Sequence, residues 1–283
     1  STANTFEVAG DCNGGIRRYN GSIDEVRVYS RALGSTEIAA LATSGAVKIG
    51  ASSVDLQKGS TLTSGLVGHW TLDGADVTTT VTDRSGQSNN GYMRNGMAPA
   101  TGKVIGKLGQ ALEFDGVDDG VRVPAHTSMN IQSDITLAAW VWLPDTTIKV
   151  QGEAIISESS SLIWDYELYF DATDTDIAFY SDGGTPTTLT SVGTVGAQKW
   201  THIAATRSGT TVSFYIDGVF DSSASMSGSL GSTARTVRLG HSEDSDDTEF
   251  SGGKIDDARI YNRALTAAEI KQLYNLGKVK ITQ

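Results

Sequence analysis

The chain has 283 residues, of which 39% are apolar and 19% are charged, with 32 glycines against 4 prolines. This composition is typical of many short strands joined by tight turns, and the length exceeds that of one small domain. The 33 acidic and 22 basic residues give a net charge of −11, which argues against binding to nucleic acid or to an anionic membrane surface.

The first part of the chain repeats the last part. Residues 23–49 match residues 255–281 without a gap, with 14 identities in 27 positions. We therefore interpret residues 1–45 as the C-terminal fragment of a preceding copy of the unit that follows. Residues 46–65, rich in Ser, Gly and Thr, are predicted to be a linker, and residues 277–283 the start of the next linker.

The complete unit is predicted over residues 66–276 and consists of short strands. Each strand is marked by an apolar or alternating run between turn residues. A Ser-Gly pair at 208–209 and an Asp-Gly pair at 217–218 are typical of hairpin turns. In chain order, we expect strands over residues 66–72, 111–114, 121–123, 135–143, 154–156, 166–170, 177–180, 200–207, 212–216, 237–239 and 255–261.

One helix is expected, and it begins at Thr266. Thr266 and Glu269 have the spacing of a capping box, in which a hydroxyl and a carboxylate satisfy the first backbone N–H groups of a helix. Ile270, Leu273 and Tyr274 would then form one apolar stripe. Many strands, one terminal helix and no βαβ spacing predict an all-β fold, a two-sheet antiparallel sandwich with a short C-terminal helix.

Five segments of the unit are similar to laminin-G-like, concanavalin A-like domains of bacterial surface proteins, and they occur in the family's order. The resemblance covers residues 66–276, whereas residues 1–45 resemble only the last strands and the helix of the same family. It implies a jelly roll of two antiparallel sheets that serves in adhesion and in binding of carbohydrate or protein. The segments are Gly65–Asp73, Leu112–Asp119, Trp200–Ala204, Phe214–Gly218 and Ile255–Leu265.

The resemblance also implies a calcium ion, because domains of this family often bind one at the rim of the sheets. Calcium takes about six to eight oxygen ligands from carboxylates, amides and backbone carbonyls. The positions that could supply them here are Asp73, Asp83, Asn89 and Asp256. The alternative is that the acidic loops are solvated and keep the protein soluble.

The strand that contains Glu113 needs a test for catalysis, because some glycosidases share this jelly roll. Strand alternation places Glu113 and Asp115 on one face. A retaining glycosidase, however, needs an acid and a nucleophile about 5–5.5 Å apart, and here the third carboxylate is the shorter Asp118, beyond a turn at Gly116. We therefore expect no enzyme activity.

Aromatic side chains would carry sugar binding, since a ring can stack on the apolar face of a pyranose. Trp164, Tyr166 and Tyr180 are the candidates. Most aromatic residues in alternating strands belong to the core, and this is the assignment expected for Trp70, Trp140 and Trp200.

The sequence thus predicts a non-catalytic extracellular module, structural or adhesive, from a repetitive surface or filament protein. Its partners would be copies of itself or adjacent repeats, associated head to tail through the fragment at residues 1–45. Two strands and a helix without the rest of their sandwich would expose an unpaired strand edge, which a partner can cover. Glycans or surface proteins are further possible partners, and no membrane insertion is expected. A calcium-dependent carbohydrate-binding module is the alternative, and a concanavalin A-like glycosidase is a distant one.

Overall fold

The computed structural model describes residue positions 28, 31, 34, 61–94, 97–98, 102–146, 153–160, 163–171, 175–183, 186–231, 233–242 and 252–278. The chain divides into two units, Ser1–Gly50 and Ala51–Gln283, and every element below belongs to the second. The fragment predicted at residues 1–45 therefore lies almost wholly outside the described residues.

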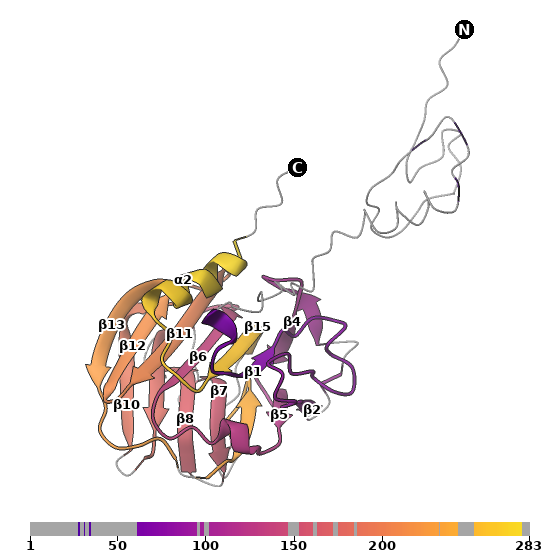
Figure 1. Cartoon of the computed structure of the whole chain (residues 1–283). Coiled ribbons are helices and arrows are strands. Elements are labelled where there is room, and N and C mark those ends of the chain that lie inside the picture. Colours follow the sequence, from indigo (N-terminus) through magenta and orange to yellow (C-terminus); the bar gives the residue numbers. More distant parts are fainter. Residues whose placement is uncertain are drawn as a thin grey trace. The chain divides into compact units, whose positions relative to one another are not determined.

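The second unit is a sandwich of two antiparallel sheets (Figure 1). The eight-stranded sheet has the order β13-β12-β11-β6-β15-β4-β3, and β1 pairs with β15 beside this path; the seven-stranded sheet has the order β10-β9-β8-β7-β14-β5-β2. The first sheet contains β1 (Leu66–Trp70), β3 (Lys103–Ile105), β4 (Gln110–Asp115), β6 (Ile135–Trp142), β11 (Trp200–Ser208), β12 (Thr211–Ile216), β13 (Val219–Ser225) and β15 (Gly252–Tyr261). The second contains β2 (Tyr92–Arg94), β5 (Gly120–Val123), β7 (Glu153–Ser160), β8 (Ile163–Phe170), β9 (Asp176–Ser181), β10 (Thr187–Thr194) and β14 (Thr236–Leu239).

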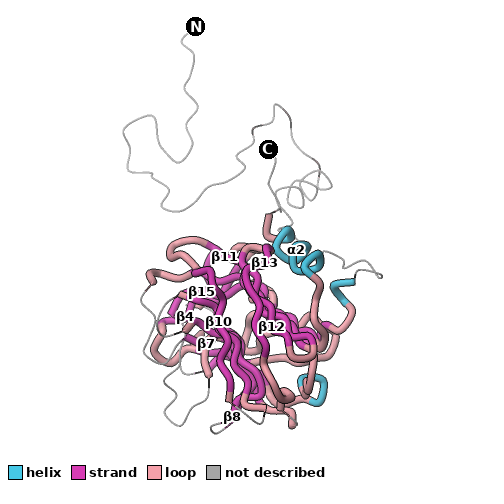
Figure 2. Tube along the Cα trace, turned by 90° about the vertical axis from the view of Figure 1, so that its left-hand side faces the viewer, coloured by secondary structure: helices cyan, strands magenta, loops and turns pink. Residues whose placement is uncertain are grey.

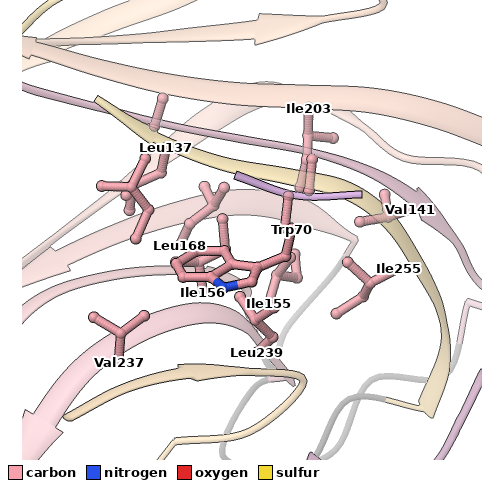
Figure 3. Close-up of a cluster of buried hydrophobic side chains, with 14 of the residues drawn as sticks. Trp70, Leu137, Val141, Ile155, Ile156, Leu168, Ile203, Val237, Leu239 and Ile255 are labelled. Carbon is pink, nitrogen blue, oxygen red and sulfur yellow. The ribbon is translucent and has the colours of Figure 1, made fainter. Parts of the chain in front are cut away.

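The core lies between the two sheets, where alternate residues of each strand point inward. Trp70 is fully buried at its centre, and Figure 3 shows its ring among aliphatic side chains of both sheets. Its Nε1 donates a hydrogen bond to the carbonyl of Asn89 at 3.0 Å, so the one polar atom of the indole is satisfied.

The repeated motif explains how the sandwich closes. β15 carries a bulge between Asp256 and Arg259, where Asp257 adopts a positive φ of 49°. Arg259 donates to Asp257 through Nε and Nη2 at 3.0 Å, and His69 Nε2 of β1 lies 2.7 Å from Asp257 Oδ1. This buried ion group joins β1 to β15.

The helix α2 (Ala267–Leu276) follows β15 and lies across the outer face of the eight-stranded sheet, beside β11 and β13 in Figure 2. The predicted capping box of Thr266 and Glu269 is confirmed. Arg263 donates to Glu269 Oε1 at 2.7 Å and to Oε2 at 3.0 Å, which fixes the helix to the end of the strand. Leu62, in the short 3₁₀ turn Thr61–Thr63, packs in the same apolar cluster as Ile270 and Leu273.

The predicted all-β jelly-roll sandwich with one C-terminal helix is confirmed, and so is the place of each expected strand. Four strands lacked a clear sequence pattern and were not expected: β2, β3, β10 and β13. The buried Leu62 shows that the last residues of the predicted linker belong to the sandwich. Among the helices that the structure describes, none is long and apolar enough to cross a membrane.

Candidate functional site

The outer face of the eight-stranded sheet is divided into a covered row and an open row of side chains. The covered row is His202, Trp140 and Asp256, which lie directly opposite one another on β11, β6 and β15. All three are at most 3% exposed, although they point away from the core.

Helix α2 and the loop at residues 106–109 bury the covered row. The ring of Tyr274 stacks on Trp140 at 5.5 Å between centroids, and the backbone N–H groups of Lys107 and Leu108 both donate to Asp256 Oδ2 at 2.7 Å. Gly277 ends the helix against the indole, because a Cβ there would lie 2.4 Å from Trp140 Cζ2.

Burial changes the protonation of this row. It lowers the pKa of His202 to about 4. It raises the pKa of Asp256 well above the usual range, an effect that the nearby Asp257 reinforces and the donors Leu108 and Lys107 oppose. Burial alone would also raise the pKa of Asp257, but Arg259 and His69 outweigh it and hold that pKa far below its usual value. Burial thus disfavours the charged forms of His202 and Asp256, next to the ion pair of Asp257 and Arg259.

Two residues further along the same strands, the sheet face is open. Trp200, Trp142, Lys254 and Glu113 lie opposite one another on β11, β6, β15 and β4, and we call them the open row. Three of them are half-buried, namely Trp200, Trp142 and Lys254, whereas Glu113 is exposed. Lys254 Nζ lies 4.4 Å from the centroid of the Trp142 ring and 3.6 Å from Glu113 Oε1.

A pocket of about 570 Å³ adjoins the open row. Trp142 and Glu113 line it together with the turn between β4 and β5. Gly253 forms part of its wall with a φ of 132°, and a Cβ at this position would lie 2.4 Å from the Trp142 carbonyl oxygen. A side chain here would force the strands apart beside the pocket.

The turn between β4 and β5 gives the pocket an acidic side. Asp115, Asp118 and Asp119 bring carboxylate oxygens within 4.8 Å of one another, the only such group of three among the described residues. Burial raises the pKa of Asp119, the backbone N–H of Asp115 opposes the rise, and the charges of Asp115 and Asp118 add to it. The spacing of these oxygens is one that a single Ca²⁺ can bridge.

The four residues predicted to bind calcium form two separate pairs in the structure. Asp83 Oδ2 accepts from the backbone N–H of Asn89 at 2.8 Å, and Asn89 Nδ2 donates to the carbonyl of Val67. Asp73 and Asp256 instead accept from opposite ends of the loop at residues 107–110. Asn89 Oδ1 and Asp256 Oδ1 are buried without a hydrogen-bond partner, so each pair keeps one oxygen that suits a cation. Calcium at these residues stays a prediction.

The aromatic assignments from the sequence need correction. Tyr166 is fully buried in the core and cannot meet a sugar, whereas Trp164 and Tyr180 lie half-buried on the seven-stranded sheet with their centroids 6.0 Å apart. Trp200, expected in the core, is only half-buried. Trp142, which lines the pocket, was not among the candidates.

The alternation of β6 was the signal for Trp142. Trp140 and Trp142 flank the core residue Val141, so both indoles had to point away from the core. The sequence did not show that α2 covers one of them and leaves the other open.

The comparison with known families agrees with this architecture. The family model described as the concanavalin A-like lectin/glucanases superfamily matches residues 115–271, more than half of the chain. The chain belongs to this superfamily. The match confirms the resemblance that the sequence motifs indicated. No curated protein matches the chain.

Several solved structures share the superfamily fold. Domain 4 of AbnA, an extracellular arabinanase from Geobacillus stearothermophilus solved with arabinotriose, is 20% identical with a TM-score of 0.60, over 74% of this chain and 98% of that domain. The binding domain of Paraclostridial Mosquitocidal Protein 1 is 16% identical with a TM-score of 0.58, over 76% of this chain and 53% of its own. The binding domain of botulinum neurotoxin serotype G is 14% identical with a TM-score of 0.57, over 76% of this chain and 51% of its own. This chain thus spans about half of each toxin binding domain, and at these identities the likeness concerns the fold alone.

Proposed function

We propose that the sandwich is a non-catalytic glycan-binding module and that its binding site is the open row with the adjoining pocket. The observation that carries this proposal is the uncovered Trp142, which lines a pocket of about 570 Å³ together with Glu113, Asp115, Asp118 and Asp119. Pockets of about 300–1,000 Å³ suit small ligands.

The chemistry of these side chains suits a sugar. An indole offers an apolar face to the C–H groups of a pyranose or furanose ring, and carboxylates accept hydrogen bonds from its hydroxyls. Trp200 lies beside Trp142 on the neighbouring strand, so a second ring can extend the stacking surface to a further sugar unit. The structural similarity to an arabinanase domain solved with arabinotriose makes an arabino-oligosaccharide a reasonable first probe.

The placement of the carboxylates favours binding over hydrolysis. Glu113 and the three aspartates all come from β4 and the turn after it, and so they line one side of the pocket. A glycosidase needs two carboxylates that flank the scissile bond from opposite sides. Glu113 Oε1 also lies 3.6 Å from the Lys254 ammonium, with which it forms an ion pair.

The binding proposal is tested by titration of the chain with oligosaccharides chosen from a glycan array, starting with arabinotriose. Trp142→Ala should abolish measurable binding without unfolding the protein. Phe220→Ala is the matched control, because Phe220 is an aromatic residue 52% exposed on β13, away from the pocket. Undiminished binding by Trp142→Ala, or loss only in Trp164→Ala, would move the site elsewhere.

Two further measurements separate the alternatives. Release of reducing sugar that disappears in Glu113→Gln would make the protein a glycosidase. Glycan affinity that falls with a chelator and returns with Ca²⁺ would support the predicted calcium ion. Loss of this Ca²⁺ effect in Asp118→Asn would place the ion at the acidic turn. Loss of the effect in Asp73→Asn would place it at the loop of residues 107–110.

We propose, as a second candidate function, self-association through the repeated segment at residues 23–49. Val28 is the counterpart of Ile260, yet Val28 is 71% exposed whereas Ile260 is fully buried in the core. A second closing segment of this kind can complete a second sandwich, as in strand addition between chains. Such a module would act in an extracellular structural or adhesive assembly.

Deletion of residues 1–60 tests the association. Light scattering should show concentration-dependent assembly of the full chain and a monomer for the shortened chain. The same molar mass for both would contradict this second proposal and leave the glycan proposal unaffected.

A further inference from the structure

A cluster of arginines lies on the opposite sheet, on its outer face at the end formed by β2, β5 and β14. Tyr92 lies directly opposite Arg122, and Arg122 lies directly opposite Arg238. Arg94 follows Tyr92 by two residues on β2 and therefore points to the same side. The valines on either side of Arg122 belong to the core, so all four side chains point outward.

Two of these arginines are accessible and have no carboxylate partner among the described residues. Arg94 and Arg122 are half-exposed, and within the described part of the chain no carboxylate pairs with either. Tyr92 beside them is 40% exposed. Arg238 is fully buried and donates through Nη1 to the carbonyl and the hydroxyl of Ser159 at 2.7 and 3.1 Å, so its position on β14 is fixed.

The positive charges act on a common region. Burial, together with the charges of Arg238, Arg94 and Arg122, lowers the pKa of His241 to about 4. Like charges directly opposite each other on neighbouring strands destabilise a sheet. Arg94 and Arg122, with which no carboxylate of the described residues pairs, therefore form an arrangement that an anion would stabilise in a chain of net charge −11.

We infer that Tyr92, Arg94 and Arg122 form a second binding site, for a glycan that carries carboxylates, such as a chain of uronic acid residues. A guanidinium binds a carboxylate through two parallel hydrogen bonds, which distinguishes an acidic sugar from a neutral one. The tyrosine ring offers a face on which the same sugar can stack. The site lies on the other sheet from Trp142 and does not depend on the glycan proposal made for the pocket.

Calorimetric titration of the full chain with a trimer of galacturonic acid tests this inference, with the neutral galactose trimer beside it. The acidic trimer should bind and the neutral trimer should not, and added salt should weaken the binding. Arg122→Gln and Arg94→Gln should each weaken the affinity for the acidic trimer at least about tenfold. Arg122→Lys should weaken it less, because lysine keeps the charge but cannot form the two parallel hydrogen bonds of a guanidinium. Lys199→Gln is the matched control, since it removes the same charge at an exposed position before β11.

Three results would overturn the inference. They are absence of binding of the acidic trimer, equal affinity for the neutral trimer, and unchanged affinity in both Arg→Gln variants. Thermal unfolding of each variant shows that it is folded. Loss of the acidic trimer in Trp142→Ala, with Arg122→Gln unchanged, would assign the binding to the pocket instead.

Discussion

The covered and open rows differ in what lies above them, although they share three strands. On β6, Trp140 and Trp142 both point out of the core and have neighbours in the same register. Tyr274, Gly277 and the loop at residues 106–109 cover Trp140, and nothing described in the chain covers Trp142 to the same extent. The comparison teaches that the position of α2 decides which indole stabilises the fold and which can bind a ligand.

The repeated motif is part of this division. Arg259 and Arg263 are identical in the two copies, and they hold Asp257 beside β1 and Glu269 at the start of α2, so these repeated residues serve the covered region. No residue of the open row lies in the motif, and Lys254 comes just before it, where the first copy has Ser22. The predictions that follow separate the stability of the first region from the binding of the second.

The largest expected effect is the loss of Trp140. Trp140→Ala should lower the free energy of unfolding by about 3–5 kcal/mol, because a large buried ring is lost and a cavity remains below α2. Chemical denaturation measures it, with Trp142→Ala as the matched variant on the same strand. A loss below that of Trp142→Ala would contradict the division into a covered and an open row.

Removal of one partner of the buried ion group should cost nearly as much. Asp257→Asn leaves Arg259 charged and buried without its counter-ion, which typically costs about 3–5 kcal/mol. Because the pKa of Asp257 is lowered in the folded state, wild-type stability from this group is present above the unfolded pKa and is lost on acidification. Urea unfolding across the acid range should therefore show a shallower pH dependence for Asp257→Asn, and an unchanged one would speak against the ion group.

The next effect is the pH dependence that the covered row adds. Folded His202 has a pKa of about 4 against 6.5 in its ordinary state, so the unfolded chain binds more protons between these values. The stability that His202 contributes should be fully present above pH 6.5 and fall toward pH 4, by on the order of 1 kcal/mol per pH unit. The raised pKa of Asp256 acts in the opposite direction, so the contribution of His202 is measured as the difference in slope between the wild type and a His202 variant.

His202→Gln should reduce this slope without removing it, since burial also lowers the pKa of His241 to about 4. Thermal unfolding at a series of pH values measures the slope. His126→Gln, at an exposed position outside the covered row, is the control for replacement of a histidine. A slope in His202→Gln equal to that of the wild type would contradict the burial of a neutral imidazole.

The smallest effect on stability is expected at Trp142. Trp142→Ala should change the free energy of unfolding by about 1 kcal/mol or less, because the ring is only half-buried and its contact with the Lys254 ammonium is a cation–π interaction near the surface. Denaturant unfolding and glycan titration of the same sample check both parts of the comparison. A variant that unfolds as readily as Trp140→Ala would make Trp142 a structural residue.

Local patterns predicted much of the fold. Alternation placed the core strands, the Thr266 and Glu269 pair placed the helix start, and the internal repeat identified the closing segment. β10 and β13 were not predicted because they are edge strands. They are rich in serine and threonine, and their Val192 and Phe220 are exposed, so they lack the apolar alternation of a half-buried strand.

The candidate site was less predictable because it depends on contacts between distant segments. Glu113, Trp142 and Lys254 come from three strands that are neighbours only in the folded sheet. The predicted ligands Asp73 and Asp256 do meet at one loop, but Asp83 and Asn89 bind each other beside β1. Loop paths of this kind are not encoded in residue spacing.

The most direct test of the account is an NMR titration of the indole N–H signals with an oligosaccharide that the chain binds. The five tryptophans give separate reporters of the core, the covered row, the open row and the opposite sheet. We predict that the signals of Trp142 and Trp200 shift with ligand while those of Trp70 and Trp140 stay in place. Shifts confined to Trp164, or no shift at Trp142 at saturation, would contradict the claim that the uncovered end of the eight-stranded sheet is the binding site.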